Sequence, residues 1–219
     1  MTASPDKVND SWRATQGRIL ALAWPIILSN ITVPLLGLVD TAVLGHLDDA
    51  RHLAAVALGS QLFTLLFWSF GFLRMGTTAL VVQASGRNDQ QQVVRVLQRA
   101  LWFIVPLAPT VALLSWLLWP LLLPLMGGGP ALQQEALQYL HIRLLATPAV
   151  LLPYSLMGWF NGQGKTRLPL LMLVTANSIN ALLDVVFVFA LDMTSNGVAL
   201  ATAIADYSAA ALGVWLAQR

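Results

Sequence analysis

The chain carries long apolar stretches along nearly its whole length, and each stretch is long enough to cross a lipid bilayer as a helix, which takes ~20 residues. We therefore expect an all-α, polytopic membrane protein with six transmembrane helices. The expected spans cover approximately residues 18–47, 53–84, 100–126, 132–160, 168–191 and 197–217. A polar segment at residues 1–17 precedes them, and the first apolar run is too long for a cleaved signal peptide.

The composition excludes several classes of protein. Of the 219 residues 57% are hydrophobic and only 10% are charged, against about 25% charged residues in soluble domains, so an ordinary soluble enzyme is excluded. The chain has 0 cysteines, which excludes disulfides and cysteine-ligated metals. No basic stripe interleaved with aromatic residues is present, so nucleic-acid binding has no support.

The basic residues fall mainly on one side of the expected membrane. With the N-terminus placed inside, Arg51 is the only basic residue in the expected outer segments. Arg74 and Arg143 fall within the expected spans. Six spans therefore predict a multi-pass protein with both termini in the cytoplasm, following the positive-inside rule. The inner segments hold Lys7, Arg13, Arg18, Arg87, Arg95, Arg99, Lys165, Arg167 and Arg219.

Three carboxylates fall in the expected hydrocarbon region, where an ionisable side chain is costly and marks a candidate functional site. Counted from the outer end of each span, Asp40, Asp184 and Asp206 lie at a similar depth. Other polar residues lie at or near this level or share a helix side with them: Asn177, Asn180, Thr202, Tyr139 and Gln61.

Oxygen ligands of this kind suit a hard cation such as Na⁺, and equally a carboxylate that binds a proton. The sequence leaves open which of the two is bound. It also leaves open whether Asp206 pairs with Arg74 or Arg143, and whether Tyr139 packs or lines a cavity. Asn177 and Gln61 are explained equally well as hydrogen-bonding contacts between helices. Histidines near the outer loop are read as solvated or packed, and no metal site is expected.

Prolines are expected to interrupt or bend several of the helices, because proline frees a backbone carbonyl. Pro25 lies one-third along the first span, below Asp40 on the same helix, which makes bending of this helix plausible. Other prolines within spans include Pro34, Pro106, Pro109, Pro120, Pro124, Pro148 and Pro153. The loop at residues 161–166 resembles a phosphate-binding loop, but it lacks the required first glycine.

Three segments resemble the multidrug and toxic compound extrusion (MATE) transporters, and their DinF-like branch in particular. They are the stretches at residues 24–30 and 37–46 and the loop at residues 161–166. The resemblance implies one six-helix lobe of a secondary transporter that has two such lobes around a central cavity. It further implies export of organic cations and other amphipathic compounds in exchange for Na⁺ or H⁺, with no other cofactor.

The resemblance also implies roles for particular residues. A cation or proton site in the N-terminal lobe would hold Asp40, Asn180, Asp184 and Thr202. Tyr139 would lie near the cavity, and Pro25 would be the position of helix bending. Only one lobe is present, so we expect the N-terminal lobe of a longer transporter in a bacterial inner membrane; a half-transporter that assembles with a second copy is the alternative.

Two other functions fit parts of the pattern. A flippase for lipid-linked precursors would need a groove rich in basic residues, and only Arg74 and Arg143 lie in spans. An intramembrane aspartyl protease would use Asp40 and Asp184 as an acid/base pair. Such enzymes carry a Gly-x-Gly-Asp motif, which neither aspartate has here, so we expect a protein that is not an enzyme.

Overall fold

The computed structural model describes residues 5–46 and 49–219, and within the first helix it leaves the side chains of residues 5–14, 18, 26, 29, 30, 32–36 and 40 outside the described part. The described chain is helical with no strand, which confirms the all-α prediction. In chain order the elements are α1 (Pro5–Leu44), α2 (Ala50–Trp68), α3 (Gly71–Gly86), α4 (Gln90–Leu122), η1 (Leu123–Met126), α5 (Pro130–Leu144), α6 (Thr147–Gly162), α7 (Arg167–Val185), η2 (Val186–Ala190) and α8 (Ser195–Ala217).

Among the described residues, four segments are long and apolar enough to cross a membrane. They are residues 50–86, 90–126, 167–190 and 195–217, and the pair α5 and α6, bent by 54°, is a fifth when counted as one span. The apolar part of α1 corresponds to the first expected span, but many of its side chains lie outside the described part. Six spans therefore remain a prediction, and a multi-pass membrane architecture is established.

Short polar signals set where the helices begin. Asp49 precedes α2 and accepts a hydrogen bond from the Arg51 backbone N–H at 2.8 Å, and Asp89 precedes α4 and accepts from the Gln92 backbone N–H at 2.9 Å. Both are N-caps, which satisfy backbone donors that the first turn of a helix leaves free. Gly127 and Gly128 both have φ of 79°, a conformation that suits glycine, and they separate η1 from α5.

The prolines interrupt the helices less than we expected. The helices α1, α4 and α6 run without a break through Pro25, Pro106 and Pro153. Pro148 does coincide with a break, because α6 begins at the preceding residue. Another break within an expected span lies between α2 and α3, at residues 69–70, and it contains no proline. Membrane helices tolerate proline where neighbouring groups satisfy the freed carbonyl.

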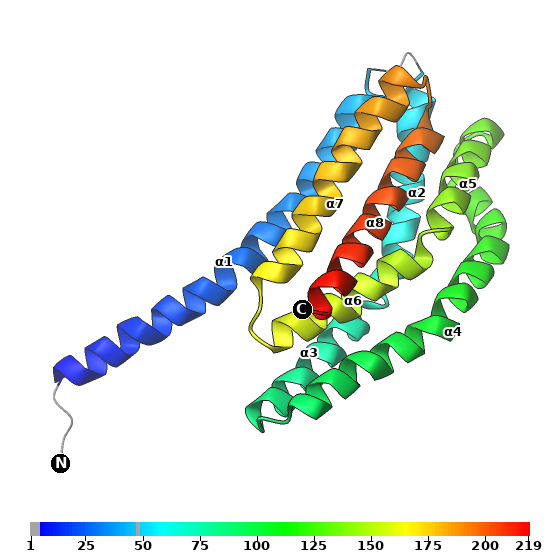
Figure 1. Ribbon diagram of the computed structural model, residues 1–219. Coiled ribbons are helices and arrows are strands. Elements are labelled where there is room, and N and C mark those ends of the chain that lie inside the picture. The colour runs from blue at the N-terminus through cyan, green and yellow to red at the C-terminus, as the bar shows by residue number, and fades with distance from the viewer. Residues whose placement is uncertain (1–4, 47–48) are drawn as a thin grey trace.

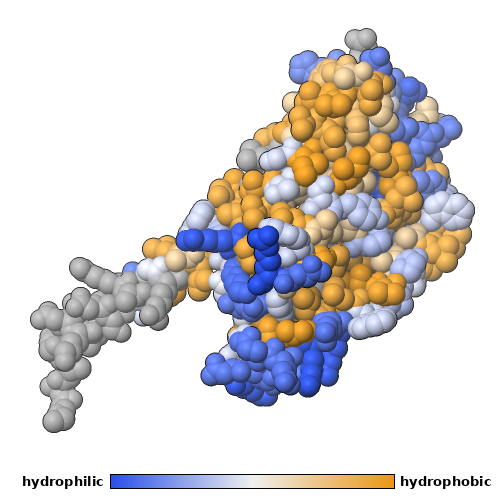
Figure 2. Space-filling model, in the orientation of Figure 1, coloured by the Kyte–Doolittle hydropathy of each residue, from blue (hydrophilic) through white to orange (hydrophobic). Residues whose placement is uncertain are grey.

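The helices form an elongated bundle in which α7 lies between α1 and α8, and α6 packs against α3, α4 and α8 (Figure 1). The α3–α4 turn, the α6–α7 loop and the end of α8 lie toward one end of the bundle, and the end of α1, the start of α2 and the α7–α8 connection lie at the other (Figure 1). The start of α1 projects away from the bundle (Figure 1). Apolar side chains cover much of the visible face, while hydrophilic ones collect at the tip where α3 meets α4 (Figure 2).

Candidate cation site

The centre of the candidate site lies on α7. Asn180 and Asp184 are both 0% exposed. They are four residues apart, so their side chains lie one above the other on the same side of the helix. The π-helical segment η2 begins two residues after Asp184, and such segments occur frequently at functional sites.

Thr202 on α8 completes a contact between the two helices. The Asn180 amide lies 3.0 Å from Thr202 Oγ1, which also lies 2.8 Å from the Val198 carbonyl oxygen. The other end of the Asn180 amide lies 3.0 Å from Asp184 Oδ2.

One orientation of the Asn180 amide satisfies all of these neighbours. Its Nδ2 donates to Asp184 Oδ2 at 3.0 Å, and its oxygen accepts from Thr202 N at 3.2 Å and Thr202 Oγ1 at 3.0 Å. An ionised carboxylate only accepts hydrogen bonds, so it suits this amide donor. Asn180 therefore connects Asp184 on α7 to Thr202 on α8.

Asp40, the fourth predicted member, belongs to α1, and its side chain lies outside the described residues. The helix itself packs along α7, the helix that carries Asn180 and Asp184 (Figure 1). Pro25 is buried in α1, and the helix continues through it.

Asp206 takes part in an ion pair one turn along α8 from Thr202. Its Oδ2 lies 2.6 Å from Arg143 Nη1 on α5, so the alternative pairing expected for Asp206 is formed with Arg143. The Arg143 guanidinium carbon also lies 4.3 Å from the centre of the Phe63 ring on α2, a cation–π contact. The pair thus joins α5 to α8 close to the α5–α6 bend.

The remaining predicted residues differ in their surroundings. Tyr139 is 3% exposed, and its ring packs against Gly59 so closely that a Cβ at Gly59 would lie 2.5 Å from Tyr139 Cδ1. Gln61 is exposed on α2 and lines a shallow pocket together with Thr64. Asn177 is half-buried on α7, one turn before Asn180. The close tyrosine–glycine packing supports the packing interpretation of Tyr139.

A polar cluster where α2, α5 and α8 begin was not predicted from the sequence. Glu135 on α5 accepts hydrogen bonds from His52 Nδ1 at 2.5 Å and Ser195 Oγ at 2.7 Å, and its other oxygen lies 3.4 Å from Arg51 Nε. It therefore ties the first turns of α2 and α8 to α5. The sequence signal was weak, because these residues lie 60 and 83 positions apart in the chain. Among the described residues, no group of His, Cys, Asp and Glu could hold a metal ion.

The MatE family model matches residues 25–186, most of the chain, so the chain belongs to the MatE family. The family consists of transporters, and the predicted family resemblance is confirmed.

Two relatives show how much of such a protein the chain represents. The chain is 42% identical over 198 residues to DNA damage-inducible protein F of Escherichia coli, and 30% identical over 194 residues to the probable multidrug resistance protein NorM of Acinetobacter baylyi. These alignments cover 90% and 87% of the chain but 43% of each relative. The chain therefore spans less than half the length of these relatives.

The fold also matches a little less than half of the length of the solved structures it resembles. A crystal structure of MATE in the bent conformation superposes with a TM-score of 0.85 at 21% identity. The match covers 91% of this chain and 44% of that one, so the two share the fold of one lobe-sized unit.

Proposed function

We propose that this chain is the N-terminal lobe of a secondary active multidrug antiporter in a bacterial inner membrane, driven by Na⁺ or H⁺. One relative is named a probable multidrug resistance protein, which supports amphipathic or cationic small molecules as substrates. In transporters built from repeats, the substrate path runs between the repeats. A second lobe, from further chain or from a second copy, would complete that path.

The contact between Asp184 and Asn180 carries the proposal. Asp184 is 0% exposed, and an ionised carboxylate at such a position is costly unless a cation or a proton neutralises it. Binding of H⁺ or Na⁺ to Asp184 would change the hydrogen bond that the Asn180 amide donates to this carboxylate at 3.0 Å. Because the same amide also bonds to Thr202, cation binding on α7 would alter the contact between α7 and α8.

Coupling to the substrate would run through α1. Asp40 and Pro25 lie on this helix, and α1 packs along α7. Neutralisation of Asp40 and Asp184 by a cation entering from outside would let α1 bend around Pro25 and shrink the drug site. The existence of a bent conformation in a solved structure of the same fold supports this step.

The substrate side of the lobe would include polar groups that the bundle does not bury. Gln61 and Thr64 are exposed within the second span, where contact with lipid is unfavourable for them. We propose that they face the cavity between the lobes. Asn177 and Asp206 would line it from α7 and α8, with Tyr139 behind them.

The test uses a complete transporter that carries this chain as its N-terminal lobe, reconstituted in vesicles with an imposed H⁺ or Na⁺ gradient. Asp184→Asn removes the charge that the cation neutralises, so gradient-driven efflux of a cationic dye should fall at least tenfold. Asp40→Asn should behave alike. Asp192→Asn, a substitution in the α7–α8 connection, is the control and should leave efflux unchanged. Undiminished coupling in both Asp40→Asn and Asp184→Asn would refute the proposal, and the gradient that drives efflux identifies the cation.

A further inference from the structure

A groove separates α3 from α4 near the end of the bundle where basic residues gather. Its volume is about 280 Å³, close to the lower end of the ~300–1,000 Å³ typical of small-molecule sites. Leu73 and Val96 are buried in its floor, and Leu80 and Phe103 are exposed along its walls. Most of the groove is therefore apolar and open to the surroundings of the helices.

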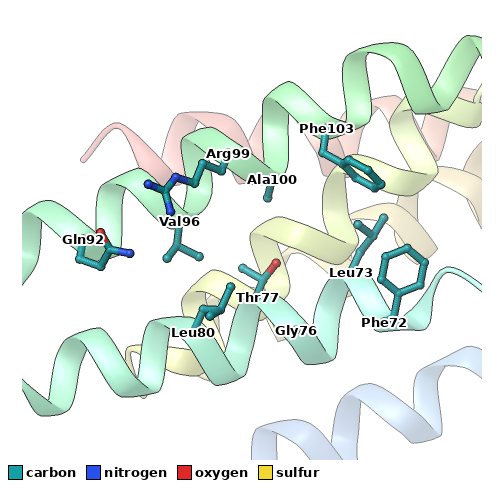
Figure 3. Close-up of a pocket in the computed structure, with 10 residues that line it drawn as sticks. All are labelled: Phe72, Leu73, Gly76, Thr77, Leu80, Gln92, Val96, Arg99, Ala100 and Phe103. Carbon is teal, nitrogen blue, oxygen red and sulfur yellow. The ribbon is translucent and has the colours of Figure 1, made fainter.

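Gly76 keeps the middle of the groove open. A Cβ built on Gly76 would meet no heavy atom within 4 Å, apart from its own helix backbone and chain neighbours. Figure 3 shows this glycine on α3 and Ala100 on the facing helix α4. The opening thus has room for an inserted chain of apolar atoms.

The two ends of the groove differ in polarity. Gln92 and Arg99 lie toward one end, and Phe72 and Phe103 lie at the other (Figure 3). The Arg99 guanidinium is turned toward the Gln92 end, and among the described residues it forms no ion pair or hydrogen bond. Arginine commonly extends in this way from an apolar surface toward the polar boundary of a membrane.

We propose that this groove binds an anionic phospholipid, with the phosphate held by Arg99 and Gln92 and an acyl chain lying over Gly76 toward Phe103. A peptide helix would leave the Arg99 charge unmatched, and the phosphate of a zwitterionic phospholipid is already balanced by the cationic group of its own headgroup. An anionic headgroup carries a net negative charge that Arg99 can balance. Basic pockets between membrane helices are known to hold such headgroups. In the proposed orientation of the chain, the lipid belongs to the inner leaflet.

The test is native mass spectrometry of the purified full chain after incubation with equal amounts of dioleoyl-phosphatidylglycerol and dioleoyl-phosphatidylcholine. The wild-type chain should retain phosphatidylglycerol in preference to phosphatidylcholine. Arg99→Gln removes the charge and should lower this preference about fivefold. Gly76→Leu fills the groove and should reduce retention of both lipids.

Two matched variants control for charge and size. Arg95→Gln removes an arginine one turn away on α4 that bonds to Gln91 instead, and Gly71→Leu enlarges another α3 glycine with open space around it. Both should retain lipid as the wild type does. The proposal would be overturned if both Arg99→Gln and Gly76→Leu retained lipid as the wild type does. It would also be overturned if Arg95→Gln lowered the preference for phosphatidylglycerol as much as Arg99→Gln does. A dimer that Gly76→Leu converts to a monomer with unchanged lipid retention would assign the groove to a second copy instead.

Discussion

At the scale of single residues, the side chain with the most demanding surroundings is Arg143. It is 7% exposed, and its charge is balanced by Asp206 at 2.6 Å and by the face of the Phe63 ring. An arginine buried in this way is strongly destabilising when its carboxylate partner is removed, because the remaining charge has lost its compensation.

Asp206→Asn should therefore lower the free energy of unfolding by about 2 kcal/mol, somewhat less than for a fully buried pair because the Asp206 side chain is 26% exposed. A double-mutant cycle with Arg143→Met, measured from unfolding in detergent, should give a coupling free energy of about 1–2 kcal/mol. Additive effects of the two substitutions would contradict a stabilising pair.

Part of this residue-level arrangement could be predicted. Helical spacing alone puts Asn180 and Asp184 on one side of α7, and equal depth in neighbouring spans predicts Thr202 beside them. The choice between Arg74 and Arg143 as partner of Asp206 could not be predicted, because it depends on the rotation of α5 against α8. The same holds for the cluster around Glu135, whose members come from three helices.

At the scale of helices, the bundle depends on glycines that let backbones approach. A Cβ on Gly158 of α6 would lie 2.5 Å from the Arg74 carbonyl oxygen on α3, and the Thr78 hydroxyl on α3 lies 3.2 Å from the Gly158 carbonyl oxygen. Small residues at such crossings are the usual basis of close helix packing in membranes.

Gly158→Ala should lower the free energy of unfolding by about 1–3 kcal/mol, because the methyl group forces α3 and α6 apart. Gly76→Ala is the matched control within α3, where a Cβ meets open space, and it should be neutral or slightly stabilising. Thermal unfolding in detergent measures both. Equal melting temperatures for the two variants would show that the α3–α6 crossing tolerates separation.

The existence and order of the helices could be predicted from the sequence, but the positions of the breaks between them could not. The apolar runs gave the existence and order of the spans correctly where the structure describes them. The prolines misled, because Pro106 and Pro153 lie within continuous helices while the α2–α3 break contains none. Whether a proline ends a helix depends on how the surrounding helices pack and on whether the freed carbonyl finds another donor, and the sequence shows neither.

At the scale of the whole molecule, the separation of charge agrees with the arrangement of the helices. The α3–α4 turn and the α6–α7 loop lie toward the same end of the bundle, away from the α7–α8 connection (Figure 1). Arg87, Lys165 and Arg167 belong to the first group and Asp192 to the second. The positive-inside rule then predicts the first end in the cytoplasm.

The absence of cysteine from the 219-residue sequence makes this orientation directly testable. A single cysteine in place of Asp192 should react with a membrane-impermeant maleimide in intact spheroplasts. Asn88→Cys and Lys165→Cys should react only after the membrane is permeabilised. The reverse pattern of labelling would place both termini outside.

The most direct test of the central claim is infrared difference spectroscopy of the chain in lipid vesicles, recorded as pH is lowered with and without Na⁺. A carboxyl band should appear on acidification, should be lost in Asp184→Asn and should shift in Asn180→Ala, while Asp192→Asn keeps the wild-type spectrum. If the bound cation is Na⁺, adding Na⁺ should suppress the band. Identical spectra for the wild type and Asp184→Asn under all these conditions would contradict a cation site at Asp184.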